Sequence, residues 1–440
     1  DAGVDMDLQG AVFLEHLGDS IAKGRVTMDQ VDTATRRVLE MKYRLGLFED
    51  PYRYADEARQ EATLYKPEFL EAARDVARKS MVLLKNEGDT LPIVAGAQSI
   101  ALIGPLADSK PDMIGSWAAA GDRQTRPVTV LEGLKARAGR GVRVEYAKGA
   151  SYEFADAGKT DGFAEALAVA NRSDVIVAVM GEKWDMTGEA ASRTSLDLPG
   201  NQQALLEELK RLGKPIILVL MSGRPNSIGW ANDNLDAIVE AWYPGTMGGH
   251  AIADVLYGDY NPSGNLPVTF PRNVGQVPIY YDMKNTGRPI ELGAPGAKYV
   301  SRYLNTPNAP LYRFGYGLSY TDFAYSPVSL SAPSMGAGGS ITASATITNT
   351  GKRAGAEIAQ LYVRDLVGSV TRPVQELKGF EKVTLQPGES RTVTFTLRPE
   401  DLAFTRQDMS HGWEPGEFRL WIAPSSGADA STPVTFTITE

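Results

Sequence analysis

The sequence predicts an α/β domain with a mostly parallel sheet, followed by an all-β sandwich. Between about residues 98 and 271, short β-branched runs alternate with helical periods, which is typical of a parallel sheet covered by helices. Residues 341–348 alternate between apolar and polar with a period of two, as a half-exposed strand does. A stretch rich in Pro, Gly and Tyr separates the two patterns. These observations predict two domains joined by a linker.

Two helices are expected before the α/β domain. Apolar residues recur at helical spacing over residues 19–43, and Gly46 follows as a stop. The second helix covers about residues 67–85 and ends where Asn86-Glu87-Gly88 breaks the pattern. The apolar stripe of the first helix requires a partner surface.

Four buried strands and three helices are expected within the α/β domain. The strands are residues 99–103, 174–180, 216–221 and 236–241, and the helices are residues 162–171, 201–212 and 248–257. Because the strands lack apolar and polar alternation, we expect both faces of the sheet to be buried. Ligands of such sheets gather in the loops that follow the carboxyl ends of the strands. These loops start at Gly104, Gly181, Ser222 and Trp242.

The carboxy-terminal third suits a β-sandwich of immunoglobulin or fibronectin type III kind. Strands are expected at residues 341–348, 358–364 and 392–397, with a turn at Asn349-Thr350-Gly351. Residues 273–320 show weak periodicity of either kind, so we expect an extended linker there.

Composition excludes several classes of function. The formal charge is −9 and Lys and Arg are scattered, which argues against nucleic acid as a partner. No stretch has the length of an apolar membrane span, and there is no polybasic membrane patch. There is no cysteine, and His16, His250 and His411 lie far apart. We therefore expect no metal site, no thiolate catalysis and no Ser–His triad.

The loop that follows the strand at 174–180 concentrates groups that could carry chemistry. It supplies Glu182, Trp184, Asp185, Glu189 and Arg193. A sugar hydrolase needs such groups, because carboxyls transfer protons or bind hydroxyls and tryptophan stacks on pyranose rings. By composition alone, however, an acidic loop is more often a solvated turn. Arg193 equally fits a structural ion-pair partner.

This window resembles a segment of family 3 glycoside hydrolases. In that family a strand ends in Gly-Glu, and a second Gly-Glu, Ser-Arg and a Leu-Pro turn follow, as they do here from Gly181 to Gly200. Other motifs match in the expected order: Met81-Val82-Leu83-Leu84-Lys85-Asn86, Ile103-Gly104-Pro105, Gly115-Ser116-Trp117, Ser222-Gly223-Arg224-Pro225, Trp242-Tyr243-Pro244-Gly245, Phe314-Gly315-Tyr316-Gly317 and Glu376-Leu377-Lys378-Gly379-Phe380. The resemblance covers the whole chain. Within the family, the chain most resembles bacterial periplasmic β-glucosidases.

The resemblance implies that one catalytic group lies outside this chain. Family members begin with a (β/α)8 barrel whose nucleophilic aspartate sits in a Ser-Asp-aromatic motif ahead of the last strand. Residues 1–6 look like that last strand, and Ser-Asp-Trp occurs nowhere after them. The sequence starts at Asp1, and its opening segment lacks the basic start and apolar run of a signal peptide, so we expect a fragment or a processed chain. The amino-terminal barrel portion is then the expected partner.

The implied activity is retaining hydrolysis of terminal, non-reducing β-glucosyl residues. One carboxylate forms a glycosyl-enzyme, and a second carboxyl protonates the leaving group and then activates water. We assign the second role to Glu182, with Glu189 as the runner-up and a barrel residue as a further alternative. Trp184 and Arg193 are the expected substrate-binding residues, with structural roles equally open. No cofactor is implied.

Other aromatic residues in strand-end loops are Trp117, Trp242 and Tyr243. They are placed to contact sugar, but large aromatics in glycine-rich loops more often pack domains together. His250 is expected at a helix start as a capping or surface residue.

The expected organisation has four parts: residues 1–60, the end of the barrel and a linker; residues 61–272, the α/β sandwich; residues 273–320, the linker; and residues 321–440, the fibronectin type III-like domain. The resemblance implies a periplasmic or secreted protein that acts on small β-glucosides or oligosaccharides, and it allows a homodimer. The main alternative is a non-catalytic carbohydrate-binding or structural module. A nucleotide-binding α/β domain is a weaker alternative, because the glycine-rich phosphate fingerprint is missing.

Overall fold

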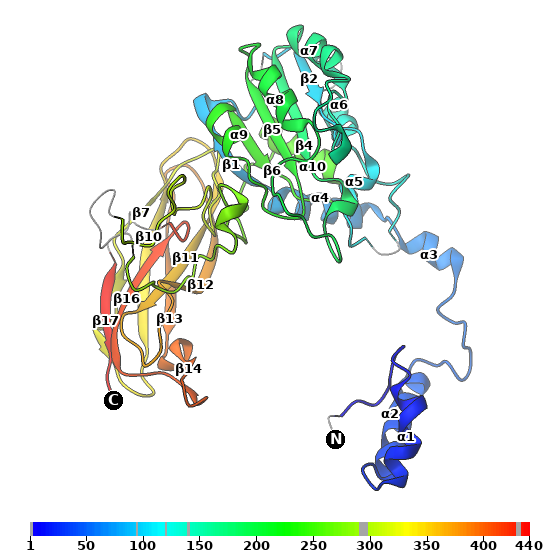
Figure 1. Ribbon diagram of the computed structural model, residues 1–440, viewed down its shortest axis with the longest axis vertical. Helices are drawn as coiled ribbons and strands as arrows, with labels where there is room; N and C mark the ends of the chain where they lie inside the picture. The colour runs from blue at the N-terminus through cyan, green and yellow to red at the C-terminus, as the bar shows by residue number, and fades with distance from the viewer. Residues whose placement is uncertain (1–2, 94–95, 119–120, 139–140, 290–297, 428–432) are drawn as a thin grey trace. The chain divides into compact units, whose positions relative to one another are not determined.

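The computed structural model describes residues 3–93, 96–118, 121–138, 141–289, 298–427 and 433–440. The chain forms two compact units, Asp1–Phe69 and Leu70–Glu440. Figure 1 shows the helices of the first unit in blue and the sheets of the second from cyan to red.

The smaller unit is helical: α1 (Val12–Ala22), α2 (Met28–Arg44) and α3 (Glu57–Thr63). The single helix predicted for residues 19–43 is wrong, because the chain leaves the helical conformation at Gly24, whose φ is 65°. It re-enters at Thr27, whose side chain accepts a hydrogen bond from the amide of Gln30. The side-chain oxygen of Gln30 accepts a hydrogen bond from the Thr27 amide in turn, which completes a capping box. Local capping therefore overrides the continuous apolar pattern.

The apolar side of this unit is open. No residue of α1 or α2 is buried, and Leu14 of α1 is 89% exposed. The predicted strand covers residues 1–6, of which residues 1 and 2 lie outside the described residues. Residues 3–6 form no strand, because a strand needs a paired neighbour and no described residue supplies one.

The chain continues through α4 (Pro67–Ser80) into β1 (Val82–Asn86). The predicted helix over residues 67–85 is therefore right only in its first part. Residues 82–86 pair antiparallel with β6 (Ala237–Glu240) at the edge of the sheet. A short apolar run fits a buried helix turn and a buried strand equally well, and only pairing decides between them.

The α/β domain is built on a six-stranded sheet with the order β1-β6-β5-β4-β2-β3. Its remaining strands are β2 (Ser99–Ile103), β3 (Arg143–Ala147), β4 (Val175–Gly181) and β5 (Ile216–Met221). All neighbours run parallel except β1. The mostly parallel sheet is confirmed, and the four predicted strands agree to within one residue at each end. The sequence pattern misses β1 and the edge strand β3.

Helices cover both faces of this sheet (Figure 1). They are α5 (Lys110–Ile114), α6 (Val130–Ala138), α7 (Phe163–Asn171), α8 (Gln202–Lys210), α9 (Gly229–Asn234) and α10 (Gly248–Tyr257). Alternate residues of β4 enter two separate cores: Ile176 and Met180 pack with α7 and α8, while Val177 and Val179 pack with α6 and α10. Both faces are therefore buried, as the unalternating strands predict.

The strand order contains a switch point next to β4. The strand β2 has β3 on one side and β4 on the other, so the chain moves outward to β3 and then returns across β2. The loops after β2 and β4 consequently diverge, and in open α/β sheets such a crevice is the usual ligand site.

The carboxy-terminal domain is a β-sandwich, as predicted. One sheet has the order β13-β10-β7, with β8 also paired to β10, and the other has the order β12-β11-β16-β17-β9. The strands are β7 (Phe323–Tyr325), β8 (Ser329–Leu330), β9 (Ser334–Met335), β10 (Ile341–Asn349), β11 (Gly355–Asp365), β12 (Glu376–Leu385), β13 (Ser390–Leu397), β16 (Gly416–Ala423) and β17 (Val434–Ile438), with a small ribbon of β14 (Phe404–Thr405) and β15 (His411–Gly412). Inward residues of both sheets form one core.

Between residues 273 and 320, the described residues form a 3₁₀ turn, Val274–Gln276, and isolated bridges rather than helices or longer strands. Lys284 bridges to Pro373 of the sandwich, and Leu318 bridges to Leu83 of β1. Among the described helices, none is both long and apolar enough to cross a membrane.

The sandwich contains an acid that should make its stability depend on pH. Burial raises the pKa of Glu357 from 4.5 to about 7, and Tyr325 donates a hydrogen bond of 2.9 Å to its carboxyl group. The folded state therefore keeps a proton that the unfolded state loses above pH 4.5, so the free energy of unfolding should fall between about pH 4.5 and 7 and then level off. A shift of this size corresponds to about 3 kcal/mol.

We predict that Glu357→Gln, which is neutral at every pH and still accepts from Tyr325, abolishes this fall. Relative to the parent, the variant should gain about 2–3 kcal/mol between pH 5 and 8 in urea unfolding. Glu417→Gln, at an exposed position of β16, is the matched control and should follow the parent. Parallel pH curves for Glu357→Gln and the parent would contradict the prediction.

Candidate active site

Glu182 is held at the carboxyl end of β4 by strand pairing. Its amide donates to the carbonyl oxygen of Met221 at 2.9 Å, which extends the pairing of β4 with β5. Gly181 precedes it with a φ of 141°, and a Cβ there would lie 1.9 Å from the same carbonyl oxygen. Only glycine fits this approach. The Gly-Glu step therefore turns the chain out of the sheet at a defined point.

The side chain of Glu182 is fully buried between two arginines. Arg193 Nη1 donates to its Oε1, and Arg224 Nε donates to its Oε2 at 3.2 Å. Arg193 Nη2 also donates to the carbonyl oxygen of Asp197 at 2.7 Å, and Arg224 Nη2 donates to that of Ala191 at 2.8 Å. The ion pairs thus tie the start of the loop to its return limb.

The Glu182 carboxylate is stable in the interior only when both Arg193 and Arg224 pair with it. A buried carboxylate is costly unless it is paired and hydrogen-bonded, and the guanidinium fork supplies both. Glu182 and Arg193, which the sequence brings to one loop, do contact each other. Their contact is a buried ion pair, which is the structural role that remained open for Arg193.

Trp184 follows Glu182 by two residues, and its ring makes a cation–π contact with Arg123. The guanidinium carbon of Arg123 lies 4.2 Å from the ring centroid, and Arg123 Nη2 donates to the carbonyl oxygen of Ser116 at 2.9 Å. The amide of Trp184 donates to Asp112 Oδ1 at 2.7 Å, and burial raises the pKa of that carboxyl group. These contacts attach Trp184 to the loop that follows β2.

Glu189 has the opposite surroundings to Glu182. Its side chain is exposed, and among the described residues it has no hydrogen-bond or ion-pair partner. Both neighbours have positive φ, 101° at Gly188 and 57° at Ala190. A Cβ at Gly188 would lie 2.6 Å from Ser116 Oγ, so the loop runs tightly against the β2 loop at this point. The carboxyl group therefore stands free on a closely held backbone.

Sequence reasoning missed three residues that build this site. Arg224 lies in the Ser-Gly-Arg-Pro motif that begins at Ser222, and its position just after a strand end was the available signal. The buried Gln202 accepts from the amide of Gly181 and donates to its carbonyl oxygen, both at 2.8 Å. Neither Gln202 nor Asp112 carries a sequence signal, because their role depends on which segments meet in the fold.

The other predicted aromatic residues fall into two kinds. Trp117 is 76% exposed, beside the loop that carries Glu189. Trp242 packs against Phe270 with ring centroids 6.2 Å apart, and its Nε1 donates to the carbonyl oxygen of Ser80 at 3.2 Å. Trp117 is therefore available to a ligand, whereas Trp242 is a packing residue.

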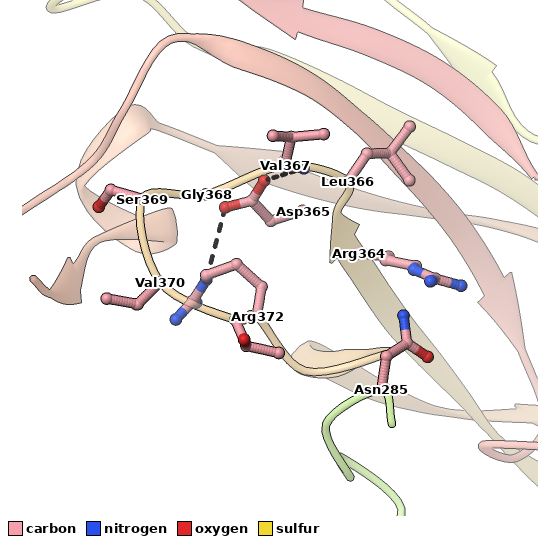
Figure 2. A pocket seen from close by; sticks show the side chains of 10 residues that line it. Asn285, Arg364, Asp365, Leu366, Val367, Gly368, Ser369, Val370 and Arg372 are labelled. Carbon is pink, nitrogen blue, oxygen red and sulfur yellow. Dashed lines mark hydrogen bonds and ion pairs between the residues drawn. The ribbon is translucent and has the colours of Figure 1, made fainter. Parts of the chain in front are cut away.

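A polar pocket in the sandwich contains none of the predicted site residues. It has a volume of about 340 Å³ and lies between the β11–β12 connection and Asn285 (Figure 2). Asp365 accepts from the amide of Val367 at 3.2 Å and pairs with Arg372 at 3.4 Å. These groups neutralise one another. Among the described residues, no cluster of His, Asp and Glu side chains is arranged to hold a metal ion.

Both domains of the chain match known protein families. Residues 81–320 match the glycosyl hydrolase family 3 C-terminal domain, and residues 357–426 match a fibronectin type III-like domain. The larger unit thus combines an α/β domain of the kind found in glycoside hydrolases with a fibronectin type III-like sandwich. The chain belongs to glycosyl hydrolase family 3.

Individual relatives agree with this assignment. The chain is 47% identical to a periplasmic beta-glucosidase of Salmonella typhimurium, over 97% of this chain and 58% of that protein. It is 40% identical to a beta-xylosidase of Formosa agariphila, over 99% of this chain and 60% of that protein. A crystal structure of beta-glucosidase from Listeria innocua in complex with glucose superposes with a TM-score of 0.89 at 36% identity, covering all of this chain and 58% of that one. The chain thus spans about three fifths of the length of these relatives.

We predict that removing either arginine destabilises the larger unit through the stranded carboxylate. Arg193→Met and Arg224→Met should each lower the free energy of unfolding by about 3–5 kcal/mol, the usual cost of breaking a buried pair from one side. Arg211→Met is the control, because Arg211 pairs with Glu208 at an exposed position. Urea unfolding at pH 7 measures the difference, and equal stability of all three variants would contradict a structural role for the cluster.

Proposed function

We propose that this chain is the part of a retaining β-glucosidase that carries the acid/base residue, active together with a barrel that supplies the nucleophile. The named relatives are β-glucosidases and a β-xylosidase, which supports hydrolysis of terminal β-linked sugars. The site supports it chemically, because carboxyl groups and tryptophans lie together at the switch point of the sheet.

We further propose Glu189, rather than Glu182, as the acid/base. The observation that carries this choice is the contrast between an exposed, unpaired carboxyl group at Glu189 and a fully buried one at Glu182. A general acid must come within hydrogen-bond reach of the leaving oxygen. Glu182 would have to break two ion pairs to do so. Its role is then to fix the loop from which Glu189 projects.

Trp184 and Trp117 are the proposed sugar contacts of this chain. Trp184 is half-buried with Arg123 over its ring, and Trp117 is exposed next to Gly188. Arg193 contributes by holding Glu182 rather than by binding hydroxyl groups.

The barrel is the proposed partner of the smaller unit. An amphipathic helix with no buried residue, such as α1 or α2, needs a surface for its apolar side. Retention requires the nucleophile of the barrel to lie about 5–5.5 Å from the acid/base in the active protein. The periplasmic relative supports a periplasmic or secreted location, and homodimer formation stays a proposal of the resemblance.

The first test asks whether the chain acts alone. Native mass spectrometry and an aryl β-glucoside assay should be run on the chain by itself and on the chain combined with the barrel portion of its own gene. We expect activity only in the combined sample. A folded but inactive combined sample would leave the binding-module alternative.

The acid/base assignment predicts different kinetics for two glutamate variants of the active protein. Glu189→Ala should slow the cleavage of glucosides with poor leaving groups by about 10²–10⁴-fold, because they need protonation. Activated dinitrophenyl glucosides should be much less affected, and azide should partly restore the rate. Glu182→Ala should lower stability and reduce the rates on both substrates together. If Glu182→Ala shows leaving-group selectivity with azide rescue and Glu189→Ala does not, Glu182 is the acid/base.

A further inference from the structure

Tyr243 lies in the loop after β6 and contacts the loops after β2, β4 and β5. A Cβ at Gly115, in the β2 loop, would lie 2.7 Å from its ring carbon Cδ2. A Cβ at Gly223, in the β5 loop, would lie 3.0 Å from Cε2. Both glycines thus leave room for the ring. The ring fills the space between two strand-end loops.

The hydroxyl group of Tyr243 contacts the loop that follows β4. It lies 3.1 Å from the carbonyl oxygens of both Glu182 and Lys183, and it donates its one hydrogen to this pair. Burial raises the pKa of Tyr243, so the hydroxyl group stays protonated and remains a donor. This bond acts on the backbone at the point where the proposed catalytic loop leaves β4.

The orientation of Tyr243 is itself held by a buried acid. Trp242 has a φ of 55°, an uncommon conformation for a bulky residue. Its amide donates to Glu240 Oε1 at 2.9 Å, and Ser222 Oγ lies 3.4 Å from the same oxygen. Glu240 is fully buried and burial raises its pKa well above the usual range. The hydrogen bond from the Trp242 amide to Glu240 therefore stabilises the strained turn. The turn directs the side chain of Tyr243 toward the neighbouring strand-end loops.

We propose that Tyr243 is a positioning residue of the glycosidase site, a role that rests on the proposed function. It sets the backbone of the Glu182–Glu189 loop in register with the loops after β2 and β5. Neither its ring nor its hydroxyl group is needed for a chemical step. Small displacements of a catalytic group are expensive, since about 1 Å can cost about 10²-fold in rate.

The structural half of the proposal can be tested on this chain, whatever its activity. Tyr243→Phe keeps the ring and removes only the hydroxyl group. Amide hydrogen exchange should become faster across residues 182–193 and stay at the parent rate elsewhere in the sheet. Tyr320→Phe is the matched control, because that hydroxyl group also donates to a backbone oxygen, that of Val255, at 2.8 Å. It should leave residues 182–193 unchanged. Unaltered exchange of this segment in Tyr243→Phe would overturn the proposal.

The catalytic half uses the enzyme completed by its barrel. Tyr243→Phe should lower kcat on poor leaving groups by roughly tenfold or more and leave activated glucosides close to the parent, because a displaced acid affects only protonation. Tyr320→Phe should match the parent on both. A parent without hydrolytic activity would refute the proposed function and leave the exchange result standing. An active parent whose Tyr243→Phe variant shows no leaving-group selectivity would refute the positioning role alone.

Discussion

The structure of the candidate site depends on one buried carboxylate, that of Glu182, and on the two guanidinium groups that neutralise it. Without both partners the charge could not remain in the interior. With them, the cluster joins the end of β4, the start of the β5 loop and the return limb at residues 191–197. A loop of more than ten residues is thereby closed at its base, and only its outer part is free to meet a ligand.

This arrangement gives two glutamates of one loop opposite surroundings. Glu182 stabilises the loop from within the protein, and Glu189 stands at its exposed part, between two residues with positive φ. Strained backbone persists only where the surrounding structure determines it strongly. Here that determination comes from Ser116 on one side and the arginine cluster on the other. A rigid support under an accessible acid is the arrangement that proton transfer to a leaving group requires.

The sandwich is part of the same unit as the α/β domain, and hydrogen bonds join the two. Lys382 of β12 donates to Ser263 Oγ at 2.8 Å and to the carbonyl oxygen of Ser263 at 3.0 Å. Gln360 of β11 donates to the carbonyl oxygen of Gly315, ahead of the sandwich, and to that of Pro424 within the sandwich. Except for the bond to Ser263 Oγ, these bonds use backbone acceptors, which do not depend on the identity of the neighbouring side chains. The smaller unit differs, since no residue of its helices α1 and α2 is fully buried by the described part of the chain.

The sequence by itself determined the fold class, the four central strands and the loop that carries the candidate site. Buried parallel strands are continuous apolar runs and half-exposed strands alternate, so both patterns are visible without the fold. It could not determine β1, because the run at residues 82–86 becomes a strand only through its pairing with β6. Nor could it distinguish the surroundings of Glu182 and Glu189, which lie in similar Gly-Glu steps. Only the tertiary structure shows that difference, because burial and the approach of Arg224 from a distant loop are properties of the packed chain.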